Sequence, residues 1–156
     1  MDDRLFRNAM GRFTTGVTVI TTKIDDEVHG MTANAFMSVS LNPKLITVSV
    51  DHKAQMHEKL RESERFAVSI LSEEQQNISK HFAGQKQAEK GIDFDFIEGV
   101  PVIPDALAAI VCKGYSSHPI GDHTLYVGEV IDIGLKEGEP LTFFAGKYGS
   151  LAKQII

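Results

Sequence analysis

The stretch LAAIVCKGYS (residues 107–116), followed by TLYVGEVIDIGL (residues 124–135), decides the fold. Both segments are long and rich in the β-branched and aromatic residues that favour strands. The short segment HPIGDH (residues 118–123) joins them and carries proline, glycine and aspartate, which are typical of turns. Two long strands joined this closely predict an antiparallel pair.

Working outward from this pair, the same criteria predict further strands and a few short helices. The predicted strands are Gly16–Thr22, Val28–Phe36, Lys44–Val50, Arg65–Leu71 and Pro140–Phe144. The predicted helices are Asp2–Met10, Ala54–Glu64 and a segment that begins at the capping-box pattern Ser72–Gln75 and runs to about Phe82. The segments Met37–Pro43 and Gln85–Pro104 are predicted to be loops.

About seven strands with few helices predict a mainly β protein, because a doubly wound parallel sheet needs a helix between successive strands. No Gly-x-Gly-x-x-Gly pattern follows a strand, so the dinucleotide fingerprint of such sheets is absent from the sequence. A closed or split β-barrel with short helices at its ends is the simplest arrangement, since closure protects the strand edges.

Length and composition restrict the protein class. A chain of 156 residues predicts one domain, residues 1–156. The net charge of −5 argues against a nucleic-acid partner, which would require a basic face. No apolar stretch approaches the roughly 20 residues of a membrane span, so no membrane association is expected. The single cysteine, Cys112, excludes an internal disulfide and predicts a reducing, cytoplasmic location.

The sequence contains no signature of a metal centre or of nucleophilic catalysis. The six histidines show no zinc spacing, and His-Glu-x-x-His is absent, so we expect no metal site. Gly-x-Ser-x-Gly is absent as well. Cys112 ends the apolar run Ala108–Cys112, which favours core packing over a reactive thiol.

Two segments could bind a ligand, although each also has a purely structural interpretation. Gly30–Ser40 carries small and hydroxyl residues where a strand would normally carry bulky ones, so a flat ligand could approach its backbone. The alternative is a polar loop at the end of a strand. Ser49–Lys53 ends a strand before a helix, where a phosphate could bind beside Lys53. The alternative is that Asp51 caps the helix and Lys53 is solvated.

Two later segments also have both a ligand-binding and a structural interpretation when each is taken alone. Gly121-Asp122-His123 could present a histidine to a ligand, or it could be the tip of a solvated hairpin. In Phe143–Gly149 the two phenylalanines suggest a core strand, and the glycines suggest a turn that would place Tyr148 at a rim.

Taken together and in order, the motifs resemble the short-chain flavin reductase family, the reductase components of two-component flavin-dependent monooxygenases. The similarity covers nearly the whole chain and is greatest to the reductases that serve phenol and 4-hydroxyphenylacetate hydroxylases. The matching segments are Met10–Thr22, Gly30–Leu41, Phe66–Leu71, Phe82–Gly84, Gly121–His123 and Gly146–Leu151.

This resemblance implies a flavin-binding split β-barrel of Greek-key topology and a homodimer. It implies hydride transfer from NADH to FAD, with FMN or riboflavin as other possible acceptors. A separate oxygenase would use the reduced flavin to hydroxylate a phenolic substrate. There are two alternatives. One is a flavin-dependent ferric reductase, and the other is a flavin-binding carrier or sensor without enzymatic activity.

The resemblance also assigns roles to individual residues. Flavin contacts are implied at Thr32, Ala33, Asn34, Ala35, Ser38 and Val39, at Ser49, Val50, Asp51 and Lys53 toward the ribityl chain and phosphate, and at Phe82, Ala83 and Gly84 along the groove. Gly121, Asp122, His123 and Tyr148 are implied on the NADH side. No catalytic acid or base is expected, because hydride transfer is the chemistry of the cofactors themselves. Backbone N–H groups of Thr32–Asn34 could stabilise charge on the reduced flavin.

Overall fold

A computed structural model describes residues 1–84 and 91–152. The predicted loop Gln85–Pro104 therefore lies partly outside the described residues. The helices are α1 (Asp3–Met10), α2 (Gln55–Glu62) and α3 (Gln76–Phe82), the last preceded by a 3-10 turn, η1 (Glu73–Gln75). The strands are β1 (Thr15–Gly16), β2 (Thr18–Ile24), β3 (Glu27–Ala33), β4 (Phe36–Ser40), β5 (Leu45–Asp51), β6 (Arg65–Ile70), β7 (Asp95–Ile97), β8 (Val100–Val102), β9 (Ala108–Ile120), β10 (His123–Leu135), β11 (Thr142–Phe144) and β12 (Lys147–Gly149).

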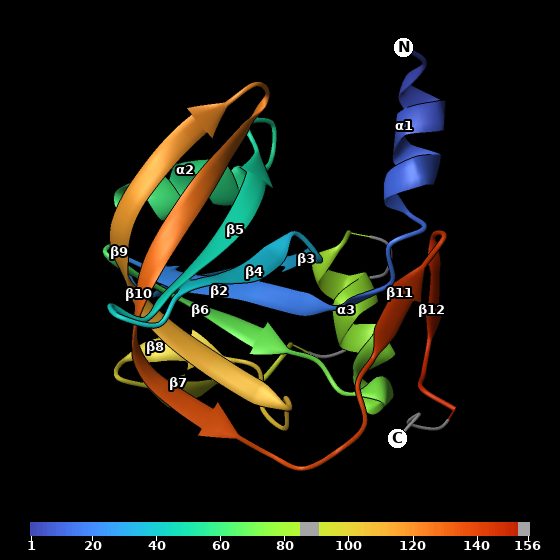
Figure 1. Cartoon of the computed structure of the whole chain (residues 1–156). Helices are drawn as coiled ribbons and strands as arrows, with labels where there is room; N and C mark the ends of the chain where they lie inside the picture. The colour runs from blue at the N-terminus through green and yellow to red at the C-terminus, as the bar shows by residue number, and fades with distance from the viewer. Residues whose placement is uncertain (85–90, 153–156) are drawn as a thin grey trace.

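A seven-stranded antiparallel sheet forms the body of the protein, in the order β3-β2-β6-β9-β10-β5-β4 (Figure 1). Its two edge strands, β3 and β4, are consecutive in the sequence and are joined only by Asn34 and Ala35. The curled sheet therefore meets itself at this connection without closing its hydrogen-bond ladder. The predicted split β-barrel with short helices is confirmed.

The predicted antiparallel pair is confirmed as β9–β10, the longest strand pair of the sheet. Its ladder runs from the pair Ala108–Leu135 to the pair Ile120–His123. Because β9 extends to Ile120, the turn contains only Gly121 and Asp122, and is shorter than the predicted connection. Gly121 adopts φ +60°, a left-handed conformation that glycine tolerates without steric cost.

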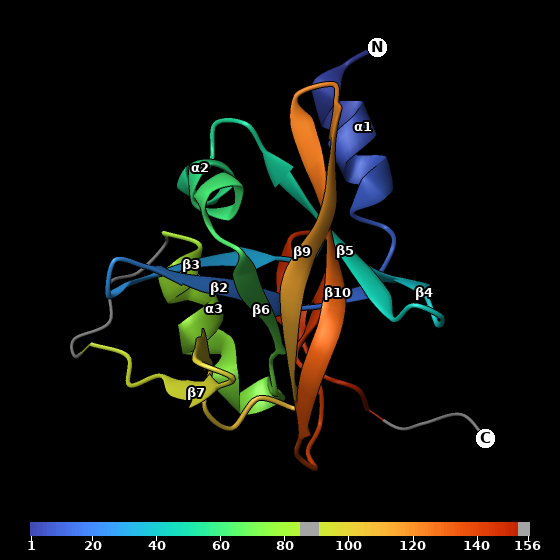
Figure 2. The same cartoon turned by 90° about the vertical axis from the view of Figure 1, so that its left-hand side faces the viewer.

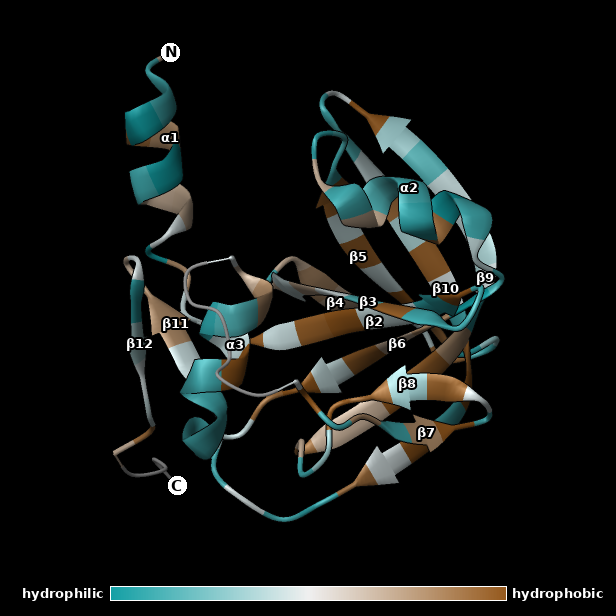
Figure 3. Cartoon of the chain, turned by 180° about the vertical axis from the view of Figure 1, so that it is seen from behind, coloured by the Kyte–Doolittle hydropathy of each residue, from teal (hydrophilic) through white to brown (hydrophobic). Residues whose placement is uncertain are grey.

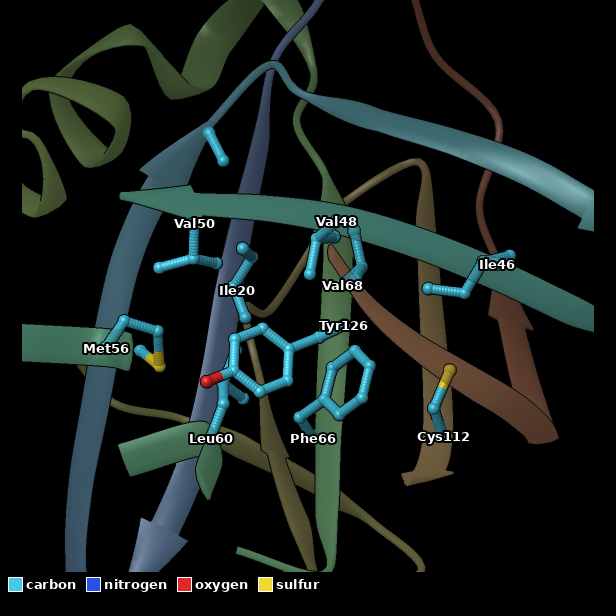
Figure 4. Close-up of a cluster of buried hydrophobic side chains, with 11 residues drawn as sticks. Ile20, Ile46, Val48, Val50, Met56, Leu60, Phe66, Val68, Cys112 and Tyr126 are labelled. Carbon is cyan, nitrogen blue, oxygen red and sulfur yellow. The ribbon is translucent and has the colours of Figure 1, made fainter. Parts of the chain in front are cut away.

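The main hydrophobic core fills the inside of the barrel. Inward side chains alternate with outward ones along each strand, because successive residues of a strand point to opposite faces. Met56 and Leu60 of α2 are buried and close one end of this core (Figure 4). The other members of the cluster come from the sheet and are Ile20, Ala33, Ile46, Val48, Val50, Phe66, Val68, Cys112 and Tyr126.

Two smaller clusters cover the outside of the barrel. One packs around Leu71, Ile103 and Leu141, with Phe82 of α3 and Phe143 of β11 against it. The other lies under the β7–β8 hairpin and includes Val100 and Val111. Among the described residues, no helix is long and apolar enough to cross a bilayer.

Helix α1 stands apart from this packing. It projects from the body of the protein in Figures 1 and 3, whereas in the view of Figure 2 it lies behind the upper part of the β9–β10 hairpin. None of its residues is buried. Its start is capped by Asp2, whose carboxylate accepts a hydrogen bond from the Arg4 N–H at 2.8 Å. The predicted helix Asp2–Met10 is confirmed within one residue at its start.

The predicted loops were partly wrong. Met37–Ser40, the first part of the predicted loop Met37–Pro43, belongs to strand β4 (Phe36–Ser40), and the predicted strand Val28–Phe36 ends at Ala33. The described part of the second loop contains the hairpin β7–β8. Each of these strands has only three to five residues and gains its hydrogen bonds from a neighbouring strand, as when Phe36 pairs with Val48 of β5.

Candidate functional site

An apolar cavity of about 620 Å³ lies where the segment before β2 faces the outer side of β4, β5 and β10. On β5 the outward residues Thr47 and Ser49 line the cavity, whereas Val48 and Val50 point into the core. The lining residues are Phe13, Thr14, Thr15, Gly16, Val17, Thr18, Asn34, Ala35, Phe36, Met37, Thr47, Ser49, Ile70 and Leu125.

Two further cavities adjoin the first and share Asn34 with it. One, of about 180 Å³, lies between β3, α3 and β12 and is lined by Val17, Thr32, Ala33, Asn34, Ser79, Ala83, Phe143 and Tyr148. The other, of about 610 Å³, follows α1 and the turn before β12, and includes Arg7, Arg12 and Ala145. Asn34 is exposed and sits in the connection between the two edge strands, so the three cavities meet at the split of the barrel.

Hydrogen bonds fix the walls around this meeting point. The Ser49 N–H donates to the Ala35 carbonyl at 3.0 Å, which ties β5 to the connection beside Asn34. The Thr32 hydroxyl donates to the Ser79 carbonyl at 2.6 Å, which ties β3 to α3. The predicted flavin residues Thr32–Ala35, Ser49 and Ala83 therefore lie around the same site.

The turn between β5 and α2 contains the predicted phosphate-binding residues. The Asp51 carboxylate accepts from the Lys53 N–H at 2.8 Å, and the Asp51 carbonyl accepts from the Ala54 N–H at 3.0 Å. Helix α2 begins only at Gln55, so Asp51 builds the turn and does not cap the helix. Lys53 is exposed, and its ammonium group makes no salt bridge within residues 1–84 and 91–152. It is therefore available to an anion.

The hairpin tip lies directly beside this turn. His123 is opposite Asp51 in the β5–β10 ladder, and the His52 N–H donates to the Asp122 carbonyl at 3.0 Å. The Nδ1 of His123 donates to the Asp122 carboxylate at 2.7 Å. This hydrogen bond and the charge of His123 lower the pKa of Asp122. Leu125, two residues along β10, lines the large cavity, whereas Gly121, Asp122 and His123 lie outside its lining.

Some predicted residues do not join the site through their side chains. The Val50 side chain is fully buried and that of Ala33 nearly so, both in the barrel core, so only their backbones are available to a ligand. Ser38 and Val39 are exposed on β4, outside the lining of the three cavities. Tyr148 lines the 180 Å³ cavity. The predicted residues that line none of the three cavities also include Asp51, Lys53, Phe82, Gly84, Gly121, Asp122 and His123.

The sequence analysis missed the contribution of the segment before β2. Phe13–Thr18 line the large cavity, yet they carry no chemical motif, and only the family signature that contains them could have drawn attention to them. The Thr15 hydroxyl is buried and has no hydrogen-bond partner among the described residues. A buried polar atom of this kind is rare, and a bound molecule or water would satisfy it.

The linings of the cavities are mostly apolar and contain few polar groups. Neither the 620 Å³ nor the 180 Å³ cavity is lined by a carboxylate, a histidine, a lysine or an arginine. The lone cysteine, Cys112, lies in the barrel core, where burial raises the pKa of its thiol to about 12. It therefore supplies no thiolate to these cavities. An apolar cavity with a few hydroxyl, amide and backbone groups suits a flat aromatic ligand whose own atoms react.

The chain matches the family described as the flavin reductase like domain over residues 10–152. Among curated proteins, it is 45% identical to an NADH-dependent flavin reductase from Rhodococcus sp, covering 93% of this chain and 84% of that protein. It is 37% identical to the reductase component of 4-hydroxyphenylacetate 3-monooxygenase from Thermus thermophilus, covering 94% of this chain and 95% of that protein.

Solved structures agree with these relatives. The flavin reductase PheA2 superimposes with a TM-score of 0.95 at 57% identity, covering 98% of this chain and 100% of that chain. The NADH:FAD oxidoreductase SgcE6 of Streptomyces globisporus, in complex with NAD and FAD fragments, superimposes with a TM-score of 0.89 at 37% identity, covering 96% of this chain and 93% of that chain. The fold, the ordered motifs and these similarities together show that the chain belongs to the flavin reductase family.

Proposed function

We propose that this protein transfers hydride from NADH to a flavin and releases the reduced flavin to a separate oxygenase that hydroxylates a phenolic substrate. FAD is the proposed acceptor, with FMN and riboflavin as further candidates. The observation that carries the proposal is the apolar 620 Å³ cavity, which extends from the split of the barrel at Asn34 along β5 to Ser49, two residues before Asp51, and has no ionisable group in its lining. The names of the relatives support the same reaction.

The flavin ring would be held by the backbone and small side chains at the split of the barrel. Thr32–Ala35 supply N–H and carbonyl groups there, and Asn34 is common to all three cavities. Phe82, Ala83 and Gly84 would border the ring from the end of α3. Ser49 lies between this point and Asp51, so the ribityl chain and phosphate would follow β5 toward Lys53. The unpaired ammonium group of Lys53 suits a phosphate.

The NADH side would include the hairpin tip and Tyr148. Tyr148 lines the 180 Å³ cavity, whereas the hairpin tip lies beside the Asp51–Lys53 turn, so the two would contact different parts of the dinucleotide. His123, with Gly121 and Asp122, stands beside the proposed phosphate turn. Tyr148 stands beside Thr32. Ser38 and Val39, at the outer edge of β4, would contact only a ligand that extends beyond the large cavity.

The protein's contribution to the reaction would be orientation and electrostatics. The flavin accepts the hydride when bound, and the reacting atoms must approach to about 3–3.5 Å. An apolar wall positions the rings and limits water. Backbone N–H groups near Asn34 would stabilise the negative charge that remains on the reduced ring. No side-chain acid or base is required, which agrees with the cavity linings.

We also propose a homodimer, which the exposed apolar face of α1 supports. Leu5, Phe6 and Met10 are 61%, 54% and 57% exposed on one face of a helix that buries nothing within its own chain. A second copy would cover this face, as apolar surface of this kind marks an interaction site. The oxygenase partner is supported by the name of the Thermus relative. The reducing, cytoplasmic location stays a prediction from the single cysteine.

The test is NADH oxidation by the purified protein with FAD, FMN or riboflavin, in the absence of iron. We expect oxidation only with flavin present, and a much lower rate with NADPH. Activity that appears only after ferric iron is added would favour the ferric reductase. Flavin binding without NADH oxidation would favour the carrier or sensor. Transfer to an oxygenase is then tested by coupled hydroxylation of a phenol with the reductase and oxygenase mixed.

A further inference from the structure

Ser79 of α3 is fully buried (0% exposed), and its hydroxyl and its carbonyl both bond to residues of the proposed site. Its hydroxyl lies 2.7 Å from the hydroxyl of Tyr148, and its carbonyl accepts the Thr32 hydroxyl at 2.6 Å. Thr32 belongs to β3 and Tyr148 to β12, so these partners are far apart in the sequence. All three residues line the 180 Å³ cavity beside Asn34.

Tyr148 has two contacts that fix its ring. The ring packs edge-on against Phe143, with the ring centres 5.3 Å apart and an interplanar angle of 66°. The second contact is the hydroxyl pair with Ser79. Strand β12 is a short strand that pairs only with β11, so its own ladder gives it little rigidity. The Ser79 hydroxyl therefore joins Tyr148 to a buried point of the barrel wall.

We propose that Ser79 is a positioning residue that holds the Tyr148 ring at a fixed distance from the flavin-side strand β3 before any ligand binds. Its carbonyl orients Thr32, and its hydroxyl orients Tyr148, so one buried residue sets the width of the cavity between them. This inference rests on the proposed function, because it assumes that Tyr148 contacts the dinucleotide. Preorganised walls improve binding because the ligand does not have to order them.

A double-mutant cycle follows from this arrangement. Ser79→Ala and Tyr148→Phe each remove one hydroxyl of the same pair, so each should release the ring to the same extent. We expect each single variant to raise the KM for NADH by about three- to tenfold, the scale of one lost hydrogen bond. Turnover should change less than about twofold, and the double variant should resemble either single one, because contacting residues are not additive.

The matched control is Ser69→Ala. Ser69 is also fully buried, but its hydroxyl accepts from the Ile103 N–H at 3.1 Å, away from the cavity. Its loss should lower stability and leave the KM for NADH unchanged. A Ser79→Ala variant with normal KM, or a double variant whose KM effects multiply, would overturn the positioning role.

A second measurement in the ligand-free protein separates this inference from the proposed function. The chain has three tyrosines, so ring carbon signals of labelled tyrosine are readily assigned by NMR. Ser79→Ala should shift the Tyr148 ring signals, and Ser69→Ala should not. Unmoved signals would overturn the inference whatever the enzyme does. Shifted signals with no flavin-dependent NADH oxidation by the wild type would refute the proposed function alone.

Discussion

His123 of β10 lies directly opposite Asp51 of β5 in the antiparallel ladder. This pairing places the hairpin tip beside the Asp51–Lys53 turn, although the two segments are far apart in the sequence. The His52 N–H completes the junction by donating to the Asp122 carbonyl at 3.0 Å. Asp51 and His123 each lie two residues beyond a residue that lines the large cavity, Ser49 on β5 and Leu125 on β10.

Lys53→Ala should weaken the binding of FAD and FMN by roughly ten- to a hundredfold, because it removes a charge-assisted contact to phosphate. Riboflavin has no phosphate and should bind this variant as it binds the wild type. Flavin fluorescence titration measures each affinity. Lys44→Ala is the matched control, since Lys44 is an exposed lysine at the opposite end of β5. Equal losses for riboflavin and FAD would show that Lys53 does not contact the phosphate.

His123→Ala should raise the KM for NADH about three- to tenfold and leave flavin affinity nearly unchanged, because the imidazole contributes one contact and no proton transfer. Steady-state kinetics with NADH and flavin varied separately measures both effects. His118→Ala is the control, since His118 is an exposed histidine of the same hairpin that hydrogen-bonds Ser116. A variant that lost flavin affinity instead would place His123 on the flavin side.

The same substitution should also raise the pKa of Asp122 toward its unperturbed value of about 3.9. The hydrogen bond from His123 and its charge lower this pKa in the folded protein. Ionised Asp122 therefore contributes to stability above the unfolded pKa, and this contribution disappears as the pH falls through the folded pKa. Carboxyl NMR titration of wild type, His123→Ala and His118→Ala measures the shift. An unchanged Asp122 pKa in His123→Ala would show that another group causes the lowering.

Gly30→Ala should destabilise the protein by about 1–3 kcal/mol, the usual cost of overpacking. A Cβ at Gly30 would lie 2.5 Å from Cε1 of Phe82, whose ring covers this glycine. Displacement of the ring should also weaken flavin binding, because Phe82 borders the proposed groove. Urea denaturation and flavin titration measure the two effects. Gly91→Ala, where a Cβ meets no atom within 4 Å, should change neither.

Light scattering at micromolar concentration should report about twice the 17.2 kDa mass of one chain. Phe6→Asp should shift this mass toward the monomer, because it places a charge in the exposed apolar face of α1. Asn8→Asp adds the same charge to a different face of the helix and should leave the mass unchanged. A wild-type protein with the mass of one chain would reject the dimer, and a dimeric Phe6→Asp variant would place the interface elsewhere.

The sequence predicted the long strands and short helices well, because their patterns are local. The β9–β10 hairpin follows from two long β-branched runs, and α1 follows from its apolar spacing and from Asp2 at its start. The ordered motifs were sufficient to predict the family, which the family match confirms. The individual roles of Lys53, His123 and Tyr148 stay predictions.

Only the tertiary structure decided how these parts form a site. Strand β4 forms because β5 offers it a hydrogen-bonding edge, and its five residues, two of them serine, do not by themselves distinguish a strand from a loop. Phe13–Thr18 line the large cavity because the sheet curls until its edge strands meet at Asn34. Ser79 joins Thr32 to Tyr148 across three separate elements. Local patterns record which residues can form a strand or a turn, whereas long-range pairing and burial fix which of them become neighbours.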